Sequence, residues 1–449
     1  MKEKKSILDS RTKILFKNIG LISIYRTLSI VLNLLTVPVL IRILGTNDYG
    51  IWIALSSVLA WMNFFDFGIS QNLQNKIAST LALGKLKETK ILVSSTYMVI
   101  SLLMFTAFII LSIISTNVDW ATLLNAEQGK SEVLKWCALI ILGSVASQII
   151  LKLVSSVLFA YQKTNLIEFI GVINQIVTLL ATIYLSKLTI LDIPILAVAI
   201  IYGVIPFIIW LCSNIIFFKF SFKLVSPSVP YIKVSKFGNI LKSSSNFFVL
   251  QIYSLVLFQT DNIIVANLFN PSYVTTFSLT TKYYSMITVL SSVMLLPLWS
   301  AISEAYANHE LQWIKDTLNK KLLVWFGLVV LGILMFSFAE ELIGLWTQTE
   351  IKIPSELSIL MMMYTLVLAY NNIFGIILNA ASKFRIQILI VSVVVVTNVP
   401  LAYLLVKGAG MGISGVVLAN LICVVCFGII ITWQALKLLN GNAKGVWAR

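Results

Sequence analysis

Long apolar runs alternate with short polar segments along the whole chain. Each run has about 20 residues or more, the length at which a helix crosses ~30 Å of hydrocarbon. The runs that predict membrane-spanning helices are 17–43, 49–69, 91–116, 134–158, 165–187, 193–218, 244–269, 272–300, 321–346, 356–381, 386–406 and 413–436. The first run is too long for a signal-peptide core and has no small-residue cleavage site after it, so we expect it to be retained. The pattern predicts an all-α multi-pass membrane protein with twelve transmembrane helices.

The polar segments between these runs repeat after about 220 to 225 residues. The matching pairs of segments are LGTNDYG (44–50) with LFNPSYV (268–274), ALGKL (82–86) with ANHEL (307–311), and LFAYQK (158–163) with LNAASK (378–383). Their order and nearly constant offset predict two six-helix halves. Because six is even, both halves enter the membrane from the same side, and a parallel pseudo-two-fold axis relates them.

The predicted domain boundaries follow from this repeat. Residues 219–238 form a polar segment with two prolines and four lysines and are predicted to be a cytoplasmic linker. The N-terminal six-helix half is then 1–218, the C-terminal half 239–437, and the cytoplasmic tail 438–449. In a parallel-repeat transporter the substrate site lies between the two halves.

Composition and charge agree with a membrane protein. The 449 residues are 59% hydrophobic and 11% charged, with a mean hydropathy of +0.94. The net charge of +15 comes mostly from lysines and arginines in the loops on one side. This distribution predicts that both termini are cytoplasmic, and it argues against nucleic acid as a partner. The four cysteines fall inside spans, where packing explains them better than redox or metal chemistry.

No catalytic constellation is apparent in the sequence. The phosphate-binding pattern GxxxxGK[ST] is absent, and His309, the single histidine, falls in a predicted cytoplasmic loop. Neither a metal site nor a hydrolytic triad can be assembled. The sequence therefore predicts a protein that is not an enzyme and that needs no metal or cofactor.

Two cations fall within predicted spans. Arg26, in SIYRTLSIVLN, is about nine residues from the start of its run, or ~13 Å along a helix. Such a residue usually faces a cavity or a partner, because an ionised side chain at the centre of a membrane helix costs at least ~2.5 kcal/mol. The alternative is that Arg26 snorkels to the inner headgroups. Lys282, in TKYY, is the second intramembrane cation.

Asp261 and Lys282 have similar predicted depths, ~12 and ~15 Å from the outer ends of neighbouring spans. We expect an ion pair between them, either as a purely structural pair or as one that holds Lys282 when a substrate site is empty. Three amides accompany Asp261 on the same span and indicate a polar, wetted helix face: Gln251, Gln259 and Asn262.

Other polar residues have simpler explanations. Asp66 and Glu304 lie near the inner ends of matching spans in the two halves. Solvation at the interface explains both, and a role as a gate is the alternative. For buried amides such as Asn371 and Asn398, hydrogen bonds between helices are expected.

Two stretches resemble the hairpin signatures of bacterial polysaccharide flippases of the Wzx type. They are LGTNDYGIWIALSSVLAWMNFFDFGISQNL (44–73) and TDNIIVANLFNPSYVTTFSLTTKYY (260–284) with LPLWSAISEAYANHE (296–310). The resemblance implies the MATE-like fold of the multidrug, oligosaccharidyl-lipid and polysaccharide exporters. Flippases of this type move undecaprenyl-diphosphate-linked repeat units of O-antigen, lipopolysaccharide or capsule across the bacterial inner membrane by alternating access. The implied partners are the lipid-linked oligosaccharide, membrane lipids and the polysaccharide polymerase machinery.

The resemblance also gives the intramembrane cations a role. In this family, cations in a central cavity are thought to receive the diphosphate, and Arg26 and Lys282 are the positions in this chain that match such a role. One alternative is a multidrug cation antiporter of the same fold, whose cavity should be dominated by carboxylates. A membrane enzyme such as a polymerase or ligase would need a large outer loop with clustered catalytic residues, and no outer loop here is that long.

Overall fold

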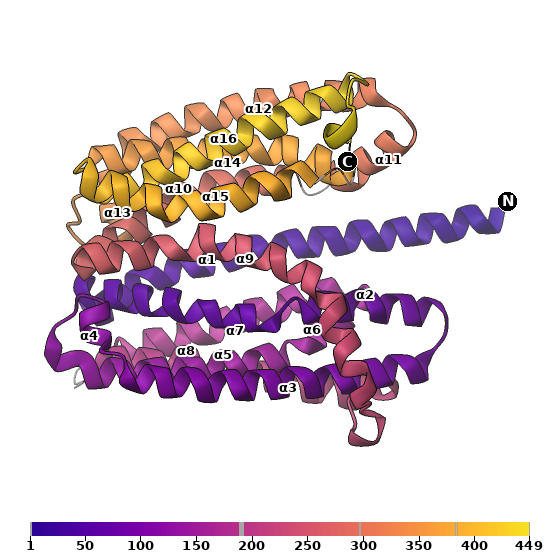
Figure 1. Ribbon diagram of the computed structural model, residues 1–449, viewed down its shortest axis with the longest axis horizontal. Helices are drawn as coiled ribbons and strands as arrows, with labels where there is room; N and C mark the ends of the chain where they lie inside the picture. The colour runs from indigo at the N-terminus through magenta and orange to yellow at the C-terminus, as the bar shows by residue number, and fades with distance from the viewer. Residues whose placement is uncertain (1, 188–192, 296–297, 382, 384, 449) are drawn as a thin grey trace. The chain divides into compact units, whose positions relative to one another are not determined.

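The computed structural model describes residues 2–187, 193–295, 298–381, 383 and 385–448 (Figure 1). The helices pack into two units, Met1–Leu255 and Val256–Arg449. Over the described residues the chain consists of α-helices joined by 3-10 helices, π-helices and turns, without a strand. An all-α fold is therefore confirmed for this part of the chain.

The first unit begins with the longest helix and ends within α9. Its elements are α1 (Lys2–Ala60), η1 (Trp61–Asp66), α2 (Ile69–Ala82), α3 (Leu86–Asn117), α4 (Trp120–Leu123), η2 (Gln128–Lys130), α5 (Ser131–Leu151), α6 (Leu153–Ala160), α7 (Thr164–Leu185), α8 (Pro194–Ile216), η3 (Phe217–Ser221), η4 (Lys223–Val225), η5 (Val229–Tyr231), η6 (Val234–Lys236) and α9 (Phe237–Leu268). Helix α1 packs on α7, and α5 packs on α3 and α8. Leu32, Val172 and Leu179 form a small core between α1 and α7.

The second unit is built around α14. Its elements are α10 (Pro271–Leu295), α11 (Leu298–Ala307), α12 (Leu311–Ser337), α13 (Ala339–Thr347), α14 (Ser355–Ala380), α15 (Arg385–Tyr403), η7 (Leu404–Gly408), α16 (Ser414–Leu439) and η8 (Gly445–Ala448). Helices α10, α12 and α16 all pack on α14. Phe374, Leu378 and Ile431 belong to the apolar core of this unit.

The first two predicted spans, 17–43 and 49–69, belong to one long helical element. Gly45 interrupts α1 with φ 72° and ψ 173°, so the chain bends between two helical segments. A glycine tolerates this left-handed φ because it has no Cβ. The second segment ends at Ala60, and α2 begins only at Ile69. The predicted end of the second span at residue 69 was therefore too late.

Nine helices of the described part are long and apolar enough to cross a membrane. The first of them, Gly20–Ala60, contains both of the first two predicted spans. Helices α9 and α10 lie where spans 244–269 and 272–300 were predicted, but they are not among the nine. The arrangement of twelve spans in two halves, with its domain boundaries, stays a prediction.

The repeated segments of the sequence coincide with equivalent helix ends. Helix α2 ends at Ala82 and α3 begins at Leu86, while α11 ends at Ala307 and α12 begins at Leu311. In both turns a backbone N–H closes back across the helix end, from Lys85 to the Thr80 carbonyl (2.9 Å) and from Glu310 to the Ala305 carbonyl (2.8 Å). The pairs 158–163 and 378–383 end in the same kind of bond, at 2.8 Å in each case.

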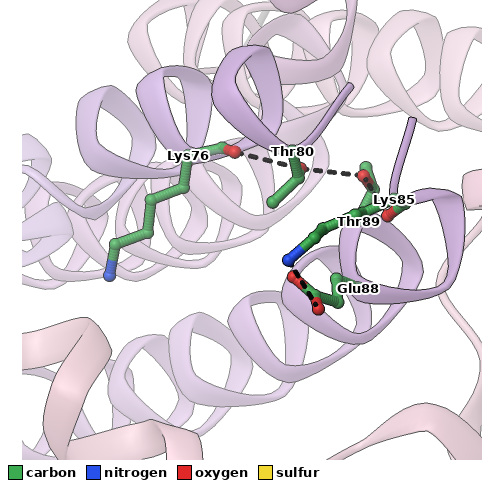
Figure 2. A network of polar contacts seen from close by, with 5 residues as sticks. All are labelled: Lys76, Thr80, Lys85, Glu88 and Thr89. Atoms are coloured by element: carbon green, nitrogen blue, oxygen red, sulfur yellow. Dashed lines mark hydrogen bonds and ion pairs between the residues drawn. The ribbon is translucent and has the colours of Figure 1, made fainter. Parts of the chain in front are cut away.

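Side chains reinforce the α2–α3 turn (Figure 2). The hydroxyls of Thr80 and Thr89 lie 2.8 Å apart and join the two helices. Each hydroxyl also lies within hydrogen-bonding distance of a carbonyl on its own side of the turn, Thr80 near Lys76 and Thr89 near Lys85. One of the two hydroxyls can therefore donate to its carbonyl while the other donates across the turn. The ammonium of Lys85 lies 3.3 Å from the carboxylate of Glu88. The turn is thus a fixed structure and not an open loop.

Candidate functional site

Arg26 forms an ion pair with Glu168. The guanidinium Nε of Arg26, on α1, donates to the Glu168 carboxylate on α7 at 3.0 Å. Beside the pair, the rings of Tyr25 and Phe169 pack 5.6 Å apart. The side chains of Arg26 and Glu168 are 48% and 29% exposed in the protein alone. The close packing of α1 on α7 therefore brings opposite charges together on a surface that is still accessible.

The guanidinium keeps part of its hydrogen-bonding capacity. Within the part of the chain that the structure describes, Arg26 meets Glu168 through Nε, and neither Nη group has a recorded acceptor. A guanidinium carries five N–H donors in a planar fork. The Nη edge is the edge at which an arginine can bind a phosphate with two parallel hydrogen bonds.

Sequence reasoning missed Glu168, although the signal was present. Glu168 falls inside the predicted span 165–187 as its one carboxylate. In the structure it is four residues past Thr164, the first residue of α7, or about 6 Å along the helix. The Glu168 side of the pair is therefore close to the start of α7. The predicted depth of Arg26 in the membrane stays a prediction, since α1 continues beyond residue 17 to Lys2.

Asp261 has a different partner from the one predicted. Its Oδ2 accepts a hydrogen bond from Asn420 Nδ2 at 2.7 Å, and this bond joins α9 to α16. Asn420 Oδ1 in turn accepts from Asn398 Nδ2 on α15, also at 2.7 Å. The ion pair of Asp261 with Lys282 that the sequence predicted is not among the contacts found between the described residues. The depths of two residues along their helices do not say which way each helix is rotated. Asn420 bonds to one oxygen of the carboxylate, and the other, Oδ1, is buried without a hydrogen-bond partner in the described part of the chain.

The remaining predicted residues are distributed over several elements. Lys282 is partly buried on α10, and Asn262 is partly buried beside Asp261 on α9. The side chains of Gln251, Gln259 and Glu304 lie outside the part of the chain that the structure describes. The predicted wetted face and the gate role of Glu304 therefore stay predictions.

Asp66 is buried, so interfacial solvation does not explain it. Its carboxylate accepts from the hydroxyl of Ser70 at 2.8 Å and from the Ser70 backbone N–H at 3.3 Å. Ser70 is in the first turn of α2, where backbone N–H groups have no helical acceptor. Asp66 thus stabilises the start of α2 after the break at Phe67 and Gly68, where both residues have positive φ.

The buried amides join helices, as the sequence indicated. Asn371 Nδ2 on α14 donates to the Val424 carbonyl of α16 at 2.9 Å, and Asn398 donates to Asn420. Among the described residues there is no group of three or more histidines, cysteines or carboxylates with the geometry of a metal site. The chemistry that the described side chains offer is the binding of charged and polar groups.

Similarity to known proteins agrees with this arrangement. A family model described as MatE matches residues 247–404. A putative O-antigen transporter of Salmonella typhimurium is 23% identical over 412 residues, which are 89% of this chain and 90% of that protein. The C-terminal part of the chain thus matches the MatE family model, and nearly the whole chain resembles an O-antigen transporter. The resemblance to Wzx-type flippases drawn from the sequence is thereby confirmed.

Solved structures give the same fold. An inward-facing multidrug resistance MATE family transporter has a TM-score of 0.75 at 12% identity and covers 93% of this chain and 96% of its own. The lipid II flippase MurJ, in an inward closed conformation, has a TM-score of 0.65 at 15% identity, with 94% and 92% covered. Both solved structures match more than nine-tenths of this chain. The similarity therefore applies to the fold of the whole chain.

Proposed function

We propose that this MATE-like transporter is a flippase that moves undecaprenyl-diphosphate-linked oligosaccharide repeat units across the bacterial inner membrane. The observation that carries the proposal is the similarity to an O-antigen transporter over about nine-tenths of both chains. The likeness in fold to a lipid II flippase supports the same class of cargo, a lipid-linked sugar.

In this proposal the cations of the membrane helices receive the diphosphate. The Nη edge of Arg26 matches a phosphate, and fixed hydrogen bonds from a guanidinium would offset the desolvation of the anion. Lys282 would supply a second positive charge from α10. The lipid tail would stay in the bilayer while the sugars cross between the two six-helix halves by alternating access.

The proposed setting follows from the charge bias of the loops. Both termini lie in the cytoplasm, because loops rich in lysine and arginine are retained there. The partners are the lipid-linked oligosaccharide, the surrounding lipids and a polysaccharide polymerase that consumes the translocated units.

The test is transport of a fluorescent undecaprenyl-diphosphate sugar in liposomes that contain the purified protein. We expect Arg26→Ala and Lys282→Ala to lose most of the transport at equal amounts of folded protein. Arg42→Ala is the matched control, because Arg42 is an exposed arginine on the same helix as Arg26. Full transport by both Arg26→Ala and Lys282→Ala would overturn the cationic mechanism, and no transport by the intact protein would overturn the function.

A multidrug cation antiporter is the second candidate. The observation in its favour is that Glu168 balances the charge of Arg26, so the described site is less cationic than the sequence suggested. The same liposomes separate the two functions, since an antiporter would move a fluorescent organic cation against a proton or sodium gradient. A flippase is expected not to transport that cation.

A further inference from the structure

The segment between α8 and α9 is a basic strap with apolar side chains on its surface. We define the strap as residues 217–236, which contain η3 to η6. The sequence has no aspartate or glutamate from residue 193 to residue 260. Four lysines of the strap are exposed: Lys219, Lys223, Lys233 and Lys236. The strap is therefore strongly positive, with no acidic neighbour in the sequence.

Large apolar side chains stand between these lysines. Phe220, Leu224, Val229 and Val234 are 74%, 70%, 80% and 72% exposed. By contrast, Phe222 and Val225 are buried against the first unit, where the Phe222 ring lies 4.7 Å from that of Tyr161. The strap thus has one face that packs on the protein and another that presents apolar and cationic side chains together.

The strap is fixed to the first turns of α3 (Figure 1). The backbone N–H of Ser228 donates to the Ser94 hydroxyl, and that of Lys233 donates to the Ser95 hydroxyl, both at 3.0 Å. The ammonium of Lys90 lies 4.6 Å from the centre of the Tyr231 ring. These contacts hold the strap in place without a continuous helix of its own.

The position along α3 gives the level of the strap relative to the membrane. Helix α3 is charged from Lys87 to Lys90 and then apolar and uncharged from Ile91 to Asn117. The strap contacts α3 at Lys90, Ser94 and Ser95, where this change occurs. Irregular backbone near hydrocarbon must have its polar groups satisfied by protein, and the two serine hydroxyls accept hydrogen bonds from the strap.

We propose that the strap lies in the headgroup region of the inner leaflet and binds anionic phospholipids. Its exposed apolar side chains enter the boundary of the acyl chains, and its lysines extend to the lipid phosphates. A cluster of four or more lysines next to a membrane helix is typical of segments that bind anionic lipids. The inference depends on the chain crossing the membrane with this side inward, and not on the identity of the cargo.

Lys76 on α2 adds a further positive charge close to the strap. Burial lowers the pKa of Lys76 on α2, and the nearby ammonium of Lys236 lowers this pKa further. Like charges gathered at one place repel each other, and lipid phosphates would relieve that repulsion.

The test measures which lipids surround the strap in the whole protein. The four native cysteines are replaced by alanine, and a fluorescent probe is attached to a Leu224→Cys variant in liposomes. Quenching is compared for brominated phosphatidylglycerol, brominated phosphatidylcholine and aqueous iodide. Two probe positions serve as references: Val330→Cys, on the exposed face of apolar α12, and Lys87→Cys, beside the α2–α3 turn.

We expect lipid to quench the Leu224 probe better than iodide does, with about a twofold preference for the anionic lipid. Changing Lys219, Lys223, Lys233 and Lys236 to glutamine should abolish the preference while quenching by neutral lipid remains. In the matched control variant, Lys315, Lys320, Lys321 and Lys383 of the second unit are changed to glutamine. This variant should keep the preference for the anionic lipid.

Three outcomes would overturn the proposal. Quenching mainly by iodide, as expected for the Lys87 probe, would mean that the strap is in water. Protection of the Leu224 probe from lipid and iodide alike would mean that protein covers this surface. Equal quenching by the two lipids in the variant with native lysines would exclude recognition of anionic lipid.

Discussion

At the residue scale, the ion pair of Arg26 with Glu168 explains how an arginine is tolerated on a membrane helix. The charge is balanced by a carboxylate on the neighbouring helix, at 3.0 Å, so the pair as a whole is neutral. Because Glu168 contacts only the Nε edge, it also orients the guanidinium. The negative charge of Glu168 would therefore repel a diphosphate that binds the Nη edge. The same carboxylate would hold the guanidinium in the orientation that the diphosphate needs.

Glu168→Gln should tighten the binding of anions to this site. The glutamine Oε1 still accepts the hydrogen bond from Arg26 Nε, while the charge of the pair rises from zero to +1. We expect the Kd for a short-chain prenyl diphosphate to fall about two- to fivefold, the effect typical of partly exposed ion pairs. The Kd is measured by titrating the protein in detergent with the prenyl diphosphate.

A carboxylate elsewhere in the same unit provides the control. Glu127 also faces a lysine, Lys130, at 3.7 Å, but it lies in the turn before α5. Glu127→Gln should leave the Kd unchanged. Weaker binding in Glu168→Gln would mean that the carboxylate helps to hold the anion through some other arrangement, and the account of the pair as a counter-ion would be wrong.

At the element scale, the packing of α14 on α16 depends on a glycine. A Cβ built on Gly428 of α16 would lie well inside the van der Waals contact distance of the side-chain oxygen of Asn371 on α14. Asn371 is buried and bonds to the Val424 carbonyl, so it cannot move away without losing that bond. Gly428 therefore allows the polar side chain of one helix to lie directly against the backbone of the other.

Gly428→Ala should destabilise the protein by about 1–3 kcal/mol, the usual cost of overpacking a buried contact. The shift of the unfolding midpoint in detergent measures this effect. Gly375→Ala, on α14, is the matched control, because its Cβ would meet nothing within 4 Å. In an Asn371→Ala background the cost of Gly428→Ala should shrink. An equal cost in both backgrounds would contradict the proposed clash.

Helices were predicted well where hydropathy is uniform and poorly where it is not. Helices α7, α8, α14 and α16 lie close to their predicted runs, because a long apolar run has only one favourable structure in hydrocarbon. Helices α2 and α11 were predicted as loops or helix ends, since short polar helices carry no such signal. Residues 219–238 were predicted as a linker, and the attachment of the strap to α3 depends on hydroxyls far away in the sequence.

At the scale of the whole molecule, the two turns at equivalent places in the repeat use different residues for the same backbone. Gly84 has φ 68°, and His309, which is 225 residues later, has φ 60°. Both precede the residue whose N–H closes back across the helix end. The two turns thus have the same backbone conformation but different side chains. For this reason the sequences of the two segments match at few positions.

Gly84→Ala should cost about 1 kcal/mol, because a left-handed residue with a Cβ is strained by ~1–2 kcal/mol and alanine recovers part of this through a less flexible unfolded chain. His309→Gly removes that strain, so we expect its stability to equal or slightly exceed that of the native protein. Unfolding midpoints measure both. Gly327→Ala, at an open helical position, controls for the general effect of replacing glycine and should not destabilise. Equal losses in Gly84→Ala and His309→Gly would contradict the equivalence of the turns.

The sequence by itself determined the class of the protein and the family that it resembles, and it predicts the sides on which its helices end. These properties depend on local composition, since apolar length and loop charge act through the solvent and need no knowledge of partners. The tertiary structure decided which polar groups meet: Glu168 with Arg26, and Asn420 with Asp261 in place of Lys282. Such pairs depend on the rotation of each helix about its axis, which is set by the packing of the neighbouring side chains.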